Sequence, residues 1–102
     1  MVRMYVRHPV EEYEAWRRAY DGFNDERAAM GVKAHAVYQA IDDANDVTVW
    51  HDFDSAEDAQ GFANSDRLRE VMDGAGVAGP PTIWFTTEAG GAAGPGRRHD
   101  DP

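Results

Sequence analysis

The sequence predicts an α+β domain in which two helices cover one face of a four-stranded antiparallel sheet. Two observations lead to this prediction. Short segments with apolar residues at every second position alternate with longer segments whose apolar residues recur every three or four positions. These segments follow one another in the order β-α-β-β-α-β, which is a split βαβ arrangement.

The first strand and the first helix have the clearest patterns. The strand is expected over Met1–Arg7, where one face carries Val2, Met4 and Val6. Pro9 ends it, because proline has no N–H to donate to a ladder. A helix is expected over Val10–Met30, with Gly31 as its C-terminal stop and Gly22 as a weak point. Its stripe of large side chains comprises Tyr13, Trp16, Tyr20, Phe23, Arg27 and Met30.

The second half of the chain begins with a predicted hairpin of two strands, which is followed by a helix and a last strand. Lys33–Ile41 and Val47–Phe53 are rich in β-branched and aromatic residues and are separated by a turn dense in Asp. Asp54 or Ser55 follows as a helix cap. The apolar stripe of the second helix is interrupted at Asn64–Asp66, which predicts a kink or a new helix start. The last strand is expected over Thr82–Thr87.

Residues 1–88 therefore form one domain with a ferredoxin-like arrangement. Residues 89–102 contain mostly Gly, Ala, Pro and charged residues, so we expect a disordered tail that can be deleted without loss of stability. The outer face of the predicted sheet carries aromatic side chains: Tyr5, Tyr38, Trp50 and Trp84. Because such a surface is unfavourable in water, we expect a homodimer that packs through this face.

Composition excludes several classes of function. The net charge of −9 disfavours binding to nucleic acid or to an anionic membrane, since both require a basic surface. The sequence contains no cysteine, which excludes a thiolate nucleophile and fits a cytoplasmic protein. It also contains no apolar run of transmembrane length and no signal-peptide core.

Two stretches of the sequence resemble a known superfamily. The strand end Trp50-His51-Asp52-Phe53-Asp54-Ser55 and the block Phe62–Glu70, together with the order of elements, resemble the dimeric α+β barrel proteins. The most similar members are those like the antibiotic biosynthesis monooxygenases, and the likeness covers residues 1–87. The resemblance implies a ligand cavity between sheet and helices. The superfamily includes cofactor-free monooxygenases, polyketide cyclases, isomerases and haem-degrading enzymes, so fold alone does not choose a reaction.

The resemblance argues against haem degradation and implies that no cofactor is needed. Haem-degrading members carry a Trp in the second helix and a His about ten residues later. This sequence has Phe62 and Met72 at those places. We therefore expect no haem turnover.

The best candidate for chemistry is a pair of histidines on the hairpin. If Val37 and Ile41 pair with Val47 and Val49, His35 and His51 lie on one face, opposite each other or one step apart. Phe53 has the same phase and leads into the second helix, so this face should look toward the helices. We expect His51, helped by His35, to act as a general base or to orient a substrate oxygen. The expected cavity walls are Tyr13, Trp16, Phe53, Phe62 and Met72.

Simpler interpretations stay open for each residue. Either histidine could be a packed core residue, and the aromatic stripe of the first helix could be plain core. His8, before Pro9, could guard the mouth of a pocket, and the favoured interpretation is a strand-end residue. We expect no metal site, because His51, Asp52 and Asp54 cannot converge from one strand. Two functions remain: a cofactor-independent monooxygenase or cyclase acting on an aromatic or polyketide-like substrate, or a non-catalytic binding protein.

Overall fold

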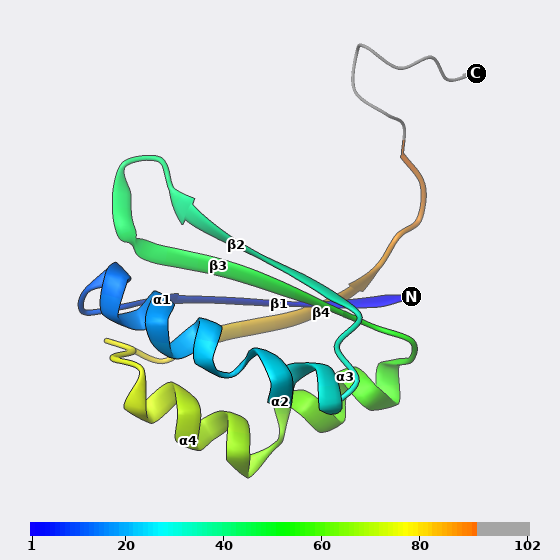
Figure 1. The fold of residues 1–102 in the computed structure, drawn as a ribbon. Coiled ribbons are helices and arrows are strands. Elements are labelled where there is room, and N and C mark those ends of the chain that lie inside the picture. Colours follow the sequence, from blue (N-terminus) through cyan, green and yellow to red (C-terminus); the bar gives the residue numbers. More distant parts are fainter. Residues whose placement is uncertain (92–102) are drawn as a thin grey trace.

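A computed structural model describes residues 1–91 and contains one antiparallel sheet. Its strands are β1 (Val2–Pro9), β2 (Ala34–Ala40), β3 (Asp43–Phe53) and β4 (Thr82–Thr87), in the spatial order β2-β3-β1-β4. All helices of this part of the chain lie on one side of the sheet (Figure 1). The α+β fold with a four-stranded antiparallel sheet is confirmed. Residues 92–102, most of the predicted tail, lie outside the described residues.

The first predicted helix is two helices, so the expectation of one helix over Val10–Met30 is wrong. Helix α1 spans Tyr13–Gly22 and α2 spans Asn24–Ala29. Phe23 separates them with φ −91° and ψ 4°, next to the glycine that has the lowest helix propensity in the segment. The start is also later than expected, because the Glu12 carboxylate accepts the N–H groups of the first turn.

The second helical segment divides where the sequence predicts. Helix α3 spans Ala56–Ala63 and α4 spans Asp66–Gly74. Each begins with a serine cap: Ser55 Oγ accepts the Asp58 N–H at 3.1 Å, and Ser65 Oγ accepts the Leu68 N–H at 3.3 Å. No helix within residues 1–91 is both long and apolar enough to cross a membrane.

The hairpin has the predicted register at its open end and a different one at its turn. His35 lies directly opposite His51, and Val37 lies opposite Val49. The expected pairing of Ile41 with Val47 is wrong, because the register shifts between Gln39 and Ala40 and Gln39 takes that position. Ile41 is therefore fully exposed in the turn. The turn is tighter than expected, since β3 begins at Asp43.

The two faces of the sheet are covered differently. The helices bury the face that carries Met4, Val6, Val47, Val49 and Phe53. The other face carries the four aromatic side chains that the sequence placed there, and the Tyr5 ring stacks on Trp84 with centroids 5.2 Å apart. The enclosed side of the sheet is therefore the one that faces the helices.

Candidate functional site

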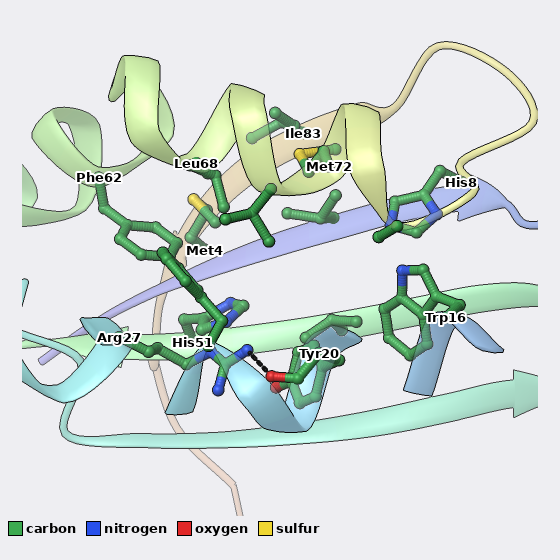
Figure 2. Close-up of a pocket in the computed structure, with 15 residues that line it drawn as sticks. Met4, His8, Trp16, Tyr20, Arg27, His51, Phe62, Leu68, Met72 and Ile83 are labelled. Carbon is green, nitrogen blue, oxygen red and sulfur yellow. Dashed lines mark hydrogen bonds between the residues drawn. The ribbon is translucent and has the colours of Figure 1, made fainter. Parts of the chain in front are cut away.

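A small cavity lies between the sheet and the helices, with a volume of about 60 Å³. Its walls come from β1, β3 and β4 and from helices α1 to α4. Figure 2 shows Leu68 and Met72 on one side of the cavity and Tyr20 on the other. Most of the lining is apolar, including Met4, Phe62, Leu68, Met72 and Ile83. Three basic side chains interrupt this lining: His8, Arg27 and His51. An apolar cavity with a few polar groups is the usual form of a small-molecule site.

Four of the predicted site residues line the cavity: Trp16, His51, Phe62 and Met72. Phe53 does not reach it, because this side chain is completely buried in the core against Phe62, with ring centroids 5.4 Å apart. Tyr13 is not among the lining residues; its ring lies 5.9 Å from that of Trp16, and its hydroxyl accepts from Arg17 at 3.1 Å.

His35 also lies outside the cavity, although it pairs with His51 across the hairpin. It is exposed, and its Nδ1 lies 2.6 Å from the Tyr20 hydroxyl. Its Nε2 lies 3.1 Å from Asn24 Oδ1. Tyr20 does line the cavity, so His35 contacts the site through this tyrosine. His35 therefore has the place of a positioning residue, which acts on the site through Tyr20.

His51 is the histidine that faces the cavity directly. It is only 5% exposed, its ring lies 5.1 Å from that of Phe62, and its Nδ1 has no hydrogen-bond partner within residues 1–91. Burial lowers its pKa to about 3, and the nearby charges of Arg27 and His35 act in the same direction. The imidazole is therefore neutral at pH 7. It can accept a hydrogen bond, and it becomes a stronger base when an anion forms beside it.

Arg27 is the main residue that sequence reasoning did not assign to the site. It is 2% exposed, and its Nη2 donates to the Tyr20 carbonyl oxygen at 2.8 Å. The guanidinium carbon lies 3.8 Å from the centre of the Tyr20 ring. Nε has no partner in the described part of the chain, and burial lowers the pKa of the group. The sequence signal for this residue was the presence of an arginine in the otherwise apolar stripe of the first predicted helix.

His8 lies at the end of β1, as predicted, and it also lines the cavity, which agrees with the alternative of a residue at a pocket. It is 4% exposed and makes an edge-on contact with Trp16, with ring centroids 5.7 Å apart. Its Nδ1 has no partner among the described residues, and burial lowers its pKa. The alternation of β1 contained the signal, because residue 8 has the phase of Met4 and Val6.

The described residues offer no cluster of three or more His, Cys, Asp or Glu side chains that could hold a metal ion. Besides Tyr20 and Trp16, three basic residues contribute polar groups to the lining, and two of these three carry neutral imidazoles. This arrangement can bind an oxygen-bearing organic molecule and accept a proton from it.

Comparisons with known proteins identify the fold. No family model matches the chain, and no curated protein does. Among solved structures, a Bordetella bronchiseptica protein provisionally assigned as an antibiotic biosynthesis monooxygenase matches with a TM-score of 0.75 and 14% identity, over 86% of this chain and 96% of its own.

Two further solved structures are oxygenases from Streptomyces. SnoaB of Streptomyces nogalater, a cofactor-independent oxygenase, matches with a TM-score of 0.72 and 11% identity, over 88% of this chain and 94% of its own. The ActVA-Orf6 monooxygenase of Streptomyces coelicolor, solved with nanaomycin D, matches with a TM-score of 0.69 and 18% identity, over 90% of each chain. The chain therefore has the fold of the antibiotic-biosynthesis-monooxygenase-like proteins, the superfamily that its sequence resembles.

Proposed function

We propose that the protein binds an aromatic or polyketide-like small molecule in the cavity and acts on it as a cofactor-independent monooxygenase or cyclase. One observation carries this proposal: three residues that line one apolar cavity, His8, Arg27 and His51, each have a buried nitrogen without a hydrogen-bond partner among residues 1–91. A buried polar group without a hydrogen bond costs about 1–3 kcal/mol, so such groups are rarely left together by chance. A ligand with oxygens at the corresponding positions would satisfy them.

The proposed reaction begins with loss of a proton from the substrate. His51, neutral at pH 7, is the proton acceptor, and the apolar walls keep water away from the resulting anion. In the monooxygenase reaction the resulting carbanion supplies the electrons that reduce O₂. One oxygen atom enters the product as a carbonyl, and the other leaves as water with the two hydrogens of the substrate carbon. His35 acts through Tyr20, whose hydroxyl it contacts. The oxygenases of the same fold support this class of reaction.

The site needs more room than the cavity alone provides. A volume of about 60 Å³ suits a few water molecules, whereas drug-sized ligands occupy roughly 300–1,000 Å³. A surface groove of about 560 Å³ lies on the other side of Leu68, Met72 and Ile83, which line both spaces. Helix α4, which carries two of these three side chains, has no buried residue. Rotation of these flexible side chains would join cavity and groove into one site.

The same proposal includes a homodimer in the cytoplasm. Trp84 is 39% exposed and Tyr38 is 54% exposed on the open face of the sheet. A second copy that packs against this face would cover both, and the opposite face would keep its cavity.

The alternative is a non-catalytic protein that binds the same class of ligand. The low pKa of His51 favours this alternative, because a weak base is a poor proton acceptor. Both functions predict binding, and only the enzyme predicts turnover.

The proposed function is tested with anthrone, a tricyclic aromatic ketone with an acidic CH₂ group. Oxygen uptake and anthraquinone formation are followed with the wild type and with His51→Phe, which fills the same space without a nitrogen. We expect His51→Phe to lower the rate by about 100-fold or more, which is typical for loss of a general base. His35→Phe is the matched control, and its loss should be smaller because His35 lies outside the cavity.

Three outcomes separate the possibilities. Turnover that survives in both His51→Phe and His51→Ala would show that His51 is a packing residue. Binding of anthrone without turnover by the wild type would favour the non-catalytic alternative. Failure of the wild type to bind anthrone or other polycyclic aromatics would contradict the proposal as a whole.

A further inference from the structure

Arg27 differs from most other arginines in the described part of the chain because it forms no ion pair. Several arginines at or near the surface pair with a carboxylate: Arg3 with Asp52, Arg7 with Asp46, Arg17 with Asp21, Arg67 with Glu26 and Arg69 with Asp66. Arg27 is more deeply buried than any of these, yet no carboxylate of residues 1–91 forms an ion pair with it. A buried charge is normally paired, because removing it from water is costly.

The contacts that Arg27 does make compensate only part of its charge. Its two terminal nitrogens donate to the Tyr20 carbonyl and to Asn24 Oδ1, and the Tyr20 ring lies against the guanidinium plane. All of these partners are neutral. Nε is buried without a partner in the described residues. The group is held firmly in place while one donor and most of its charge remain unused.

The position of Arg27 relates this charge to the ligand site. Figure 2 shows Arg27 beside His51 and Phe62 at one end of the cavity, with His8 and Trp16 at the other end. Between them the lining is apolar. A ligand in this space would therefore meet a cation and an imidazole at one end, aliphatic and aromatic walls along its body, and a second imidazole at the far end.

We propose that Arg27 forms an anion subsite, and that the ligand is an aromatic acid whose ionised oxygen lies between Arg27 and His51. The shared chemistry is a negatively charged oxygen, supplied by a carboxylate or by an ionised enol. The Nε–H of Arg27 donates to it, and the buried charge gains its missing counter-ion. This inference rests on the proposed function, since it names the ligand class of the same cavity.

The net charge of the chain makes the inference more specific. At −9, the protein as a whole repels anions. Preferential binding of an anion over its neutral isostere therefore requires a local cation in the binding site, and non-specific attraction cannot produce it.

The test compares 2-naphthoate with 2-naphthamide, which has the same shape without the charge. Binding to the wild type, Arg27→Met and Arg17→Met is measured by calorimetry at constant ionic strength. We expect naphthoate to bind the wild type about tenfold or more tightly than naphthamide, as for a hydrogen bond to a charged group. Arg27→Met should abolish this preference and leave naphthamide within about twofold. Arg17→Met removes the same charge from the surface of α1 and should keep the preference.

A second pair of probes distinguishes the two sources of the anion. Lawsone, an ionised enol at neutral pH, is compared with its neutral methyl ether. A preference for the ion in the lawsone pair alone indicates an enolate ligand, and a preference in the naphthoate pair alone indicates a carboxylate. Either result supports the anion subsite.

The outcomes that overturn the inference differ from those that overturn the proposed function. Equal affinity of the wild type for charged and neutral probes in both pairs removes the anion subsite and leaves the small-molecule site standing. An equal loss of both naphthalene probes in Arg27→Met shows that Arg27 acts through packing and also overturns it. If no aromatic probe binds the wild type, anthrone included, both proposals fail.

The stability of Arg27→Met provides an independent readout. An unpaired buried cation is unfavourable for folding, so its replacement by a side chain of similar length should leave the melting temperature unchanged or raise it. If Arg27→Met does not fold, the preference of the wild type for naphthoate over naphthamide decides whether the anion subsite exists. A shift of the Arg27 Nε–H resonance with naphthoate, absent with naphthamide, is then expected, and its absence would contradict the subsite.

Discussion

The two faces of the sheet differ in which side chains have suitable surroundings: polar side chains on the open face, and apolar side chains on the inner face. On the open face, polar groups are paired: Arg3 makes two hydrogen bonds to Asp52, at 2.7 and 3.0 Å, and the Trp50 Nε1–H lies 3.4 Å from the Tyr38 hydroxyl. Its aromatic surface stays partly exposed. On the inner face the apolar side chains are covered, while nitrogens of His8, Arg27 and His51 lack partners among the described residues.

This difference indicates what each face needs. A face with satisfied polar groups and uncovered aromatic rings gains most from an apolar partner, and a second copy of the chain provides one. A covered face with unsatisfied nitrogens gains most from a polar group that can enter a closed space, and a small oxygen-bearing ligand provides that. The open face is thus suited to assembly and the inner face to ligand chemistry.

Trp84→Glu should have the largest effect and tests the open face. It places a charge on the aromatic surface that a second copy would bury. A buried unpaired carboxylate costs several kcal/mol, so the dissociation constant of the dimer should rise by about 100-fold or more. Sedimentation at micromolar concentration measures this. Ile41→Glu, in the exposed hairpin turn, is the control and should leave the dimer intact. A wild type that sediments as a monomer would remove the assembly role of this face.

The pH dependence of stability should have a smaller effect and tests the inner face. The pKa of His51 falls from its ordinary value of 6.5 to about 3 in the folded chain, mainly through burial. The unfolded chain therefore takes up a proton that the folded one excludes, so stability is fully present above pH 6.5 and is lost as pH falls toward 3. The loss is about 1.4 kcal/mol per pH unit at most, or about 2 kcal/mol between pH 6.5 and 5.

Urea unfolding at pH 7 and pH 5, at one protein concentration, measures this loss. His51→Phe should reduce it by the His51 contribution. The remaining slope comes from the other groups that titrate near this range, including His8 and His35, whose pKa values burial also lowers. An identical pH dependence in the wild type and His51→Phe would mean that His51 is charged or solvated in the folded protein.

Asp52→Asn should have the smallest effect and refines the comparison within the open face. It breaks an ion pair whose two side chains are 37% and 12% exposed, so we expect a loss of about 1 kcal/mol in the free energy of unfolding. Asp46→Asn, in the more exposed pair with Arg7, should cost less than Asp52→Asn. A larger cost for Asp46→Asn would show that Arg3 and Asp52 are already separated in solution.

Local patterns in the sequence were sufficient for the elements and their faces. The alternation in β1 and β3 assigns Met4, Val49 and His51 to the buried face, because neighbouring strand residues must point to opposite sides. The Asp54-Ser55 and Asn64–Asp66 segments predict where α3 and α4 begin, because capping depends on residues within one turn, and the structure identifies Ser55 and Ser65 as the caps. The resemblance at Phe62–Glu70 added the superfamily fold.

Competition between local preferences was harder to predict. The apolar stripe from Tyr13 to Met30 was continuous, yet the chain breaks at Phe23, where packing of this ring in the core outweighs the continuity of one helix. Ile41 fits a strand pattern, but the tight turn of the hairpin leaves it in water. Register at a turn depends on both strands at once.

The sequence by itself determined the fold, the buried phase of His51 and the placement of His35 on the same face of the hairpin, whereas the direct pairing of the two histidines came from the structure. Only the tertiary structure decided which basic groups share the cavity. His8 and Arg27 are separated by α1 in the chain, and they line the same cavity as His51 because α1 and α2 pack over the face of β1 and β3 that carries the two histidines. Whether a nitrogen finds a partner depends on every neighbouring element, and no period or spacing in one segment contains that information.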